Sequence, residues 1–295
     1  MYNPEARLIH AIDAKRERRV ELSPLMESAY ERAQAEVLTS PEYVIQEKDF
    51  IQKYGTARVQ SDIALADRLE RKFNSERSVT EANSKKIADT FEAIMLMQSE
   101  LGEWLGSNAS TLRSARYDDF VNKVDMVVEW NMPGQDSEVL ALAVDVTFGT
   151  SGIDKKITAI RNEIERGKLG SIDYYRNQDS TDLAPRLNVA RTVVGIGQPV
   201  VEELAGLWMA NNNKALGIHP VQRAIVDQIG FQLFRMQQYA VHLGKFETAQ
   251  VYKQAYAAIQ RVQVEKQGIP PRGLIDDPVR LEIFNQTREQ FPTRH

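Results

Sequence analysis

Two short apolar runs, VDMVVEW (residues 124–130) and LALAVDVTFG (140–149), each contain one aspartate, Asp125 in the first and Asp145 in the second. Successive side chains of a strand point to opposite faces. The larger apolar residues of the second run would therefore share one face, and Asp145 and Thr147 would share the other. About eight residues join the runs, which suits an antiparallel hairpin with a longer loop. Such a hairpin would bring both aspartates to the same end.

Two carboxylates at one end of a hairpin repel each other unless a cation lies between them. Oxygen ligands of this kind suit Mg²⁺ or Mn²⁺. The spacing therefore predicts a divalent metal site at Asp125 and Asp145. Two further aspartates, Asp118 and Asp119, come just before the first run. They would either add a metal ligand, with Asp119 the better candidate, or cap a turn through backbone amides.

The segments around the hairpin predict a mixed α/β (α+β) core. A helix over 78–105 comes before it, where Ser78 and Glu81 form a capping box. A helix over 152–167 follows, and then two β-rich runs, SIDYY (171–175) and VARTVVGI (189–196). The expected core thus extends over 78–200.

The helix expected over 152–167 has an isoleucine stripe on one side. On a helical wheel Lys156 lies about 70° from the centre of that stripe, so it can lean toward the sheet, whereas Lys155 points to solvent. The segment 155–168 has more basic residues than acidic ones, the latter being Glu163 and Glu165. We expect three of the basic residues to contact backbone phosphates: Arg161, Arg166 and Lys168.

The stretch RYDDFVNKVDMVVEW … LALAVDVTFG … KKITAIRNEIERGKLGSIDYY … VARTVVGI resembles uncharacterised bacterial proteins of the PD-(D/E)XK nuclease superfamily, over about 85–200. The resemblance implies a restriction-endonuclease-like αβββαβ core. Asp125 and Asp145 would match the two acids, while Thr147 occupies the position of the family's lysine. In some members the lysine comes from the following helix, which implies that Lys156 takes this role.

The family often carries an inward glutamate on the first core helix. We expect Gln98 to lie on the buried face of this helix, with Glu92 and Glu100 pointing away. Gln98 would then either occupy the place of the glutamate without its charge or be a buried amide bonded to backbone.

Both flanks of the core are predicted to be helical, as regions 1–77 and 201–295. Helix starts are expected at Ser23-Pro24 and at Ser40-Pro41. Toward the C-terminus, two long helices are expected at about 219–243 and 246–266. These helical arms are more than a minimal nuclease needs, so they could make a homo-oligomer or bind partners.

The net charge of −4 means that any DNA contact must come from a local basic patch. The chain has no cysteine, which excludes zinc-thiolate sites and a cysteine nucleophile. Without an apolar leader or a bilayer-length run, we expect a cytoplasmic protein that does not enter a membrane. The sequence predicts a Mg²⁺- or Mn²⁺-dependent DNA nuclease with catalytic Asp125, Asp145 and Lys156. The alternative is a non-catalytic nuclease-like scaffold.

Overall fold

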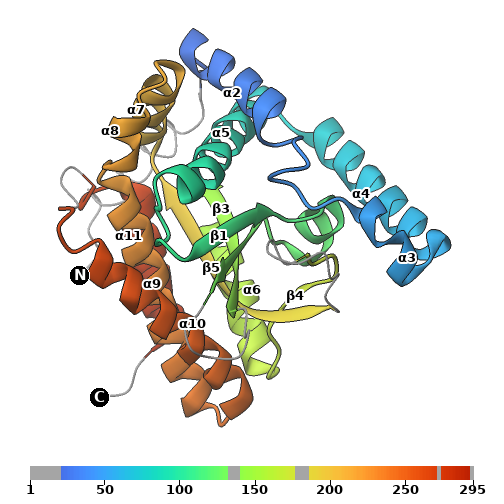
Figure 1. Ribbon diagram of the computed structural model, residues 1–295. Helices are drawn as coiled ribbons and strands as arrows, with labels where there is room; N and C mark the ends of the chain where they lie inside the picture. The colour runs from blue at the N-terminus through green and yellow to red at the C-terminus, as the bar shows by residue number, and fades with distance from the viewer. Residues whose placement is uncertain (1–20, 132–139, 177–185, 271–273, 293–295) are drawn as a thin grey trace, which may run out of the picture.

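The computed structural model describes residues 21–131, 140–176, 186–270 and 274–292. Within these ranges the chain is mixed α+β, with helices packed around one five-stranded sheet (Figure 1). The strands lie in the order β1-β2-β3-β5-β4. Their bounds are β1 (Ala109–Arg113), β2 (Met126–Trp130), β3 (Leu140–Phe148), β4 (Gly170–Ile172) and β5 (Leu187–Ile196).

The strands β1, β2 and β3 form an antiparallel meander, and β5 pairs with β3 in parallel after a crossover through α6 (Ile153–Glu165). Met126 lies opposite Val144, and the Asp125 amide donates to the Val144 carbonyl at 3.2 Å. This register confirms that Asp125 and Asp145 lie at the same end of the strand pair. The loop expected between the strands lies outside the described residues.

Alternation along the strands divides the sheet as the sequence predicts. Leu142, Val144 and Val146 belong to the main hydrophobic cluster, together with Met126 and the other even-numbered residues of β2. On the opposite face, Asp145 and Thr147 line a pocket. Val124 precedes β2, does not follow the alternation of the strand, and lies in a second cluster.

The helices begin largely where local chemistry predicts. Ser23 caps α2 by accepting from the Met26 amide, and the capping box of Ser78 and Glu81 opens α5. The helix expected at Ser40-Pro41 is wrong, since residues 41–43 form a turn that leads into a bridge between Val44 and Arg113. The N-terminal helical bounds are α2 (Pro24–Glu36), η1 (Glu47–Phe50), α3 (Ile51–Tyr54), α4 (Thr56–Glu76) and α5 (Val79–Leu101), and η2 (Asp118–Asn122) is a π-helical turn before β2.

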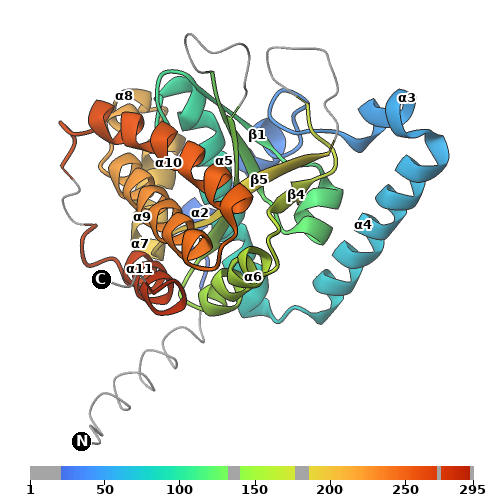
Figure 2. The same ribbon diagram turned by 90° about the horizontal axis from the view of Figure 1, so that it is seen from below.

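After the sheet the chain is helical again, as predicted. The bounds are α7 (Gln198–Met209), α8 (Asn213–Gly217), α9 (Val221–His242), α10 (Phe246–Glu265) and α11 (Pro278–Gln290). These helices gather along one side of the sheet, and α4 extends on the other side (Figures 1 and 2). In α9, Gln232 pairs its amide with the backbone of Val193, and Gln228 does the same with Gly195. These two glutamines make the backbone hydrogen bonds that a neighbouring strand would otherwise make along this part of β5.

One hydrophobic cluster contains side chains from α2, from the sheet and from α9. The regions 1–77, 78–200 and 201–295 therefore contribute to a shared core. The division of the chain into these three regions stays a prediction, because the contacts within the shared core do not show where one region ends and the next begins. Among the described residues, no helix has the length and apolarity that crossing a bilayer requires.

Candidate functional site

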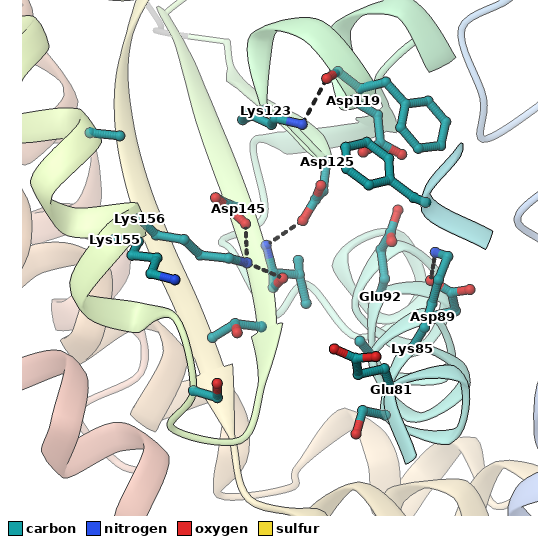
Figure 3. Close-up of a pocket in the computed structure, with 18 of the residues that line it drawn as sticks. Glu81, Lys85, Asp89, Glu92, Asp119, Lys123, Asp125, Asp145, Lys155 and Lys156 are labelled. Atoms are coloured by element: carbon teal, nitrogen blue, oxygen red, sulfur yellow. Dashed lines mark hydrogen bonds and ion pairs between the residues drawn. The ribbon is translucent and has the colours of Figure 1, made fainter. Parts of the chain in front are cut away.

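A cavity of about 650 Å³ opens between α5 and α6, above the ends of β2 and β3 that carry the two aspartates (Figure 3). It is rich in charges of both signs. The acidic lining residues are Glu81, Asp89, Glu92, Asp119, Asp125 and Asp145. The basic ones are Arg77, Lys85, Arg113, Lys123, Lys155, Lys156 and Arg191. We call this cavity the charged pocket.

The ammonium group of Lys156 lies in the charged pocket beside the second aspartate (Figure 3). Its Nζ is 2.5 Å from Asp145 Oδ1 and donates to the Val146 carbonyl at 3.1 Å. Burial lowers the pKa of Lys156, but Asp145 and Asp125 outweigh that effect and hold it above its ordinary value. The wheel angle of Lys156 thus predicted its direction correctly. Thr147 lines the same pocket but supplies no charge.

A second cation reaches Asp145 from β5. The guanidinium of Arg191 is 3.5 Å from Asp145 Oδ2 and 2.8 Å from Glu163 Oε1. The side chain of Arg191 is only 4 % exposed and that of Asp145 6 %. Two cations therefore neutralise the Asp145 carboxylate inside the protein, which opposes the desolvation cost of burying it.

Asp125 has different surroundings. Its Oδ2 accepts the Val146 amide at 2.7 Å, so the first aspartate is attached to the strand that carries the second. Burial raises the pKa of Asp125 well above its ordinary value, and the nearby charges of Asp145 and Asp119 raise it further. Lys156 only partly offsets these effects. The predicted repulsion between the two aspartates therefore acts mainly on Asp125. A further cation would be stabilised next to this carboxylate.

Glu92 was expected to point away, but it is buried and lines the charged pocket. Its Oε1 accepts from Arg113 Nε at 2.7 Å. Burial raises its pKa to about 7, although Arg113 acts in the opposite direction. In Figure 3 the Glu92 carboxylate points from α5 toward Asp125. Glu92 thus points inward from this helix, contrary to the expectation.

Gln98, the alternative candidate on α5, is fully buried and does not line the charged pocket. Its side-chain amide has no hydrogen-bond partner among the described residues, so it is not the backbone-bonded amide that was the other expectation. The helical wheel failed because residues 89–99 are buried on every side of α5. A single apolar stripe does not identify the pocket side of such a helix.

The two aspartates before β2 divide between the two expected roles. Asp118 is fully buried and accepts the amides of Asp173 and Tyr174, which is the turn-capping role. Asp119 lines the charged pocket with its side chain 27 % exposed, 3.9 Å from Arg113. Burial raises the pKa of Asp119 while Arg113 lowers it. The structure therefore places Asp119, and not Asp118, where a metal ligand was expected.

The basic residues expected to contact phosphates, Arg161, Arg166 and Lys168, do not line the charged pocket. Arg161 instead pairs with Glu165 at 2.8 Å and donates to the Tyr239 hydroxyl at 3.2 Å. Lys155 is exposed, as predicted, but it borders the pocket (Figure 3). The cations of the pocket come from the ends of α4 and η2, from α5, from the first turn of α6 and from the strands β1 and β5. A DNA-binding role for the three distal residues stays a prediction.

The donor atoms of the charged pocket are oxygens, which Mg²⁺ and Mn²⁺ prefer. Within the described ranges, no group of three or more His, Cys, Asp or Glu side chains is arranged to hold a metal ion. Magnesium commonly takes only one or two protein carboxylates and completes its shell with water and phosphate oxygens. Asp125 and Asp145 fit that smaller requirement, and burial together with the neighbouring carboxylates holds the pKa of Asp125 above its ordinary value.

The arrangement suits a phosphate diester together with a divalent cation. Carboxylates lie at the strand ends, and lysines from two helices surround them. Comparisons with protein-family models, with curated proteins and with solved structures found no match to this chain.

Proposed function

We propose that this protein is a metal-dependent DNA nuclease that hydrolyses phosphodiester bonds in the charged pocket. The observation that carries the proposal is the position of Lys156. Its ammonium lies 2.5 Å from Asp145 in the pocket that Asp125 also lines. A cation thus stands beside the two acids although Thr147 occupies the strand position where a lysine would be expected.

The order of elements also supports the proposal. An α-helix, an antiparallel meander, a crossover helix and a parallel strand follow one another as α5, β1–β3, α6 and β5. The resemblance to the PD-(D/E)XK superfamily implies the same order, and β4 is an addition at the edge of the sheet. We therefore propose a nuclease-like core of this type, with the lysine moved from β3 to α6.

Asp125 and Asp145, with the Val146 carbonyl, would hold a Mg²⁺ or Mn²⁺ ion, and Asp119 would support it. When bound, such an ion polarises the phosphate and lowers the pKa of a coordinated water. Lys156 stays charged because its pKa is raised, so it stabilises negative charge on the phosphate and does not take up a proton. Glu92 has a pKa of about 7, near the value that suits a general base at neutral pH.

The reaction balances with water alone. The water oxygen bonds to phosphorus, the bond from phosphorus to one sugar oxygen breaks, and that oxygen takes up a proton. Glu92 can accept the proton that the attacking water loses. The products are two shorter strands, one with a terminal phosphate and one with a terminal hydroxyl.

One observation favours the non-catalytic alternative. Lys156 and Arg191 already neutralise Asp145 without any metal ion. A scaffold that evolved from a nuclease could keep this ion pair for stability and bind partners or form an oligomer through its helices. Such a scaffold would bind no Mn²⁺ in the charged pocket.

The test uses Asp125→Asn, because this substitution removes a carboxylate whose pKa is already raised and keeps the shape of the side chain. We expect the wild type to cleave labelled DNA only with Mg²⁺ or Mn²⁺, and the variant to lose cleavage by about 100-fold or more. Calorimetric titration with Mn²⁺ alone should show binding to the wild type and not to the variant. Asp227→Asn, which changes an aspartate paired with Arg223 on α9, is the control and should behave as wild type. Absence of both Mn²⁺ binding and cleavage in the wild type would favour the scaffold.

A further inference from the structure

An aromatic pair lines the charged pocket. Phe73, near the end of α4, and Phe120, in η2, stack with their ring centroids 6.1 Å apart and their planes inclined by 16°. Both rings are only half-buried, and both line the cavity that contains Asp125 and Asp145. Neither phenylalanine belongs to the hydrophobic clusters of the core. The catalytic function proposed above gives these rings no role.

α4 is also held here by ion pairs that do not involve the two rings. Arg116, two residues before η2, binds Asp67 and Glu70 of α4 at 2.6 Å each. Cations line the same cavity as the aromatic pair. Lys123 Nζ lies 5.1 Å from the centroid of the Phe73 ring, and Arg77 from the segment after α4 lines the same cavity. Aromatic rings with cations beside them are the means by which proteins bind unpaired nucleotides, through base stacking and phosphate contacts.

The volume of the cavity suits a single nucleotide. About 650 Å³ lies in the range of pockets that take one ligand of drug-like size. A base that reaches the two rings has to be unpaired or to have left its stack.

We infer that Phe73 and Phe120 form a stacking platform for an unpaired base, and that the substrate is single-stranded DNA or a DNA end with unpaired nucleotides. This inference rests on the proposed function. The base stacks on the platform, Lys123 and Arg77 contact the flanking phosphates, and the next phosphate lies at Asp125, Asp145 and Lys156. Intact duplex DNA is then a poor substrate because its bases cannot reach the rings.

Binding can be tested without catalysis by Phe120→Trp in the full-length protein with a chelator present. The native tryptophans Trp104, Trp130 and Trp208 are all buried, so a base in the pocket does not reach them. We expect a short oligothymidylate to quench the new tryptophan, because a stacked base quenches indole fluorescence. An abasic strand of equal length and charge, and a blunt duplex, should quench it several-fold less. Phe234→Trp, on α9 and outside the pocket, is the matched control and should show no base-dependent quenching.

A second measurement uses Phe120→Leu and Phe120→Tyr with the same oligothymidylate. Loss of one stacked base should weaken binding about tenfold in the leucine variant. The tyrosine variant should bind like the wild type, because it keeps the ring. Equal binding of all three proteins, or equal quenching by the abasic strand, would overturn the platform.

The outcomes separate the two proposals. Base-dependent quenching in a protein that shows no Mg²⁺-dependent cleavage would overturn the hydrolytic function and leave the platform supported. Cleavage of blunt duplex as fast as of single strands, without base-dependent quenching, would overturn the platform and leave the nuclease supported. Faster cleavage of single strands, reduced by Phe120→Leu and kept by Phe120→Tyr, would support both.

Discussion

Asp125 and Asp145 occupy equivalent positions in the sequence pattern of two adjacent strands, yet their surroundings in the charged pocket differ. Asp145 is paired with Lys156 at 2.5 Å and with Arg191 at 3.5 Å. Asp125 accepts a backbone amide and has its pKa raised well above normal by burial and by neighbouring carboxylates. The β3 side of the pocket thus carries its own counter-charge, while the β2 side lacks one. The difference indicates where the protein supplies a cation, and it is at Asp125 that we propose a bound cation.

The largest effect should come from the counter-charge itself. Lys156→Met removes the ammonium beside Asp145, and we expect the rate of DNA cleavage to fall by about 100-fold or more, since no other group takes its position. Lys155→Met changes the adjacent, exposed lysine and is the matched control, with a fall of about tenfold or less. The measurement is single-turnover cleavage of labelled DNA. Equal losses in the two variants would remove Lys156 from the catalytic group.

Stability should separate the two aspartates. Asp145→Asn leaves Lys156 and Arg191 without their buried anion, and we expect a loss of about 3 kcal/mol in the free energy of unfolding. Asp125→Asn removes a charge that burial and repulsion disfavour, so the metal-free protein should be unchanged or more stable. Urea unfolding of both variants at neutral pH measures the contrast. A loss of similar size in both variants would show that Asp125 is also a paired charge.

The same asymmetry predicts a pH dependence. A carboxyl whose folded pKa lies above its unfolded value contributes stability at low pH, and that contribution is lost as pH rises through the folded pKa. For Asp125 the loss begins at about pH 4, the ordinary aspartate pKa, and continues upward to its raised folded value. Between about pH 5 and pH 8, the wild type should therefore lose more stability than Asp125→Asn. Other raised carboxyls, such as Glu92, act in both proteins, so the difference reports Asp125 together with its interaction with Glu92. A constant difference across this range would refute the assignment.

Local patterns predicted the parts of the site that depend on local geometry. Strand alternation placed Asp145 and Thr147 on one face, and the helical wheel aimed Lys156 at the sheet. Glu92 was missed because α5 is surrounded by other elements and has no solvent side there. The strand β1 was not identified separately, since ASTLR contains no apolar run, although the meander of the resembled family requires it. The stacking of Phe73 on Phe120 depends on the path of α4, which no local pattern records.

The smallest expected effect concerns which cations contact DNA. The charged pocket contains Lys123, whereas Arg161 lies outside it and is paired with Glu165. Lys123→Gln should weaken binding of single-stranded DNA a few-fold and lower the slope of its salt dependence by about one phosphate contact. Arg161→Gln should leave both unchanged, because its guanidinium is engaged with Glu165 and the Tyr239 hydroxyl. Titration of labelled oligonucleotide at several salt concentrations measures both quantities. If Arg161→Gln gave the larger change, DNA would follow the C-terminal half of α6, as the sequence predicted. Lys123 would then not contact DNA beside Asp125, and a metal ion alone would provide the positive charge on the β2 side of the pocket.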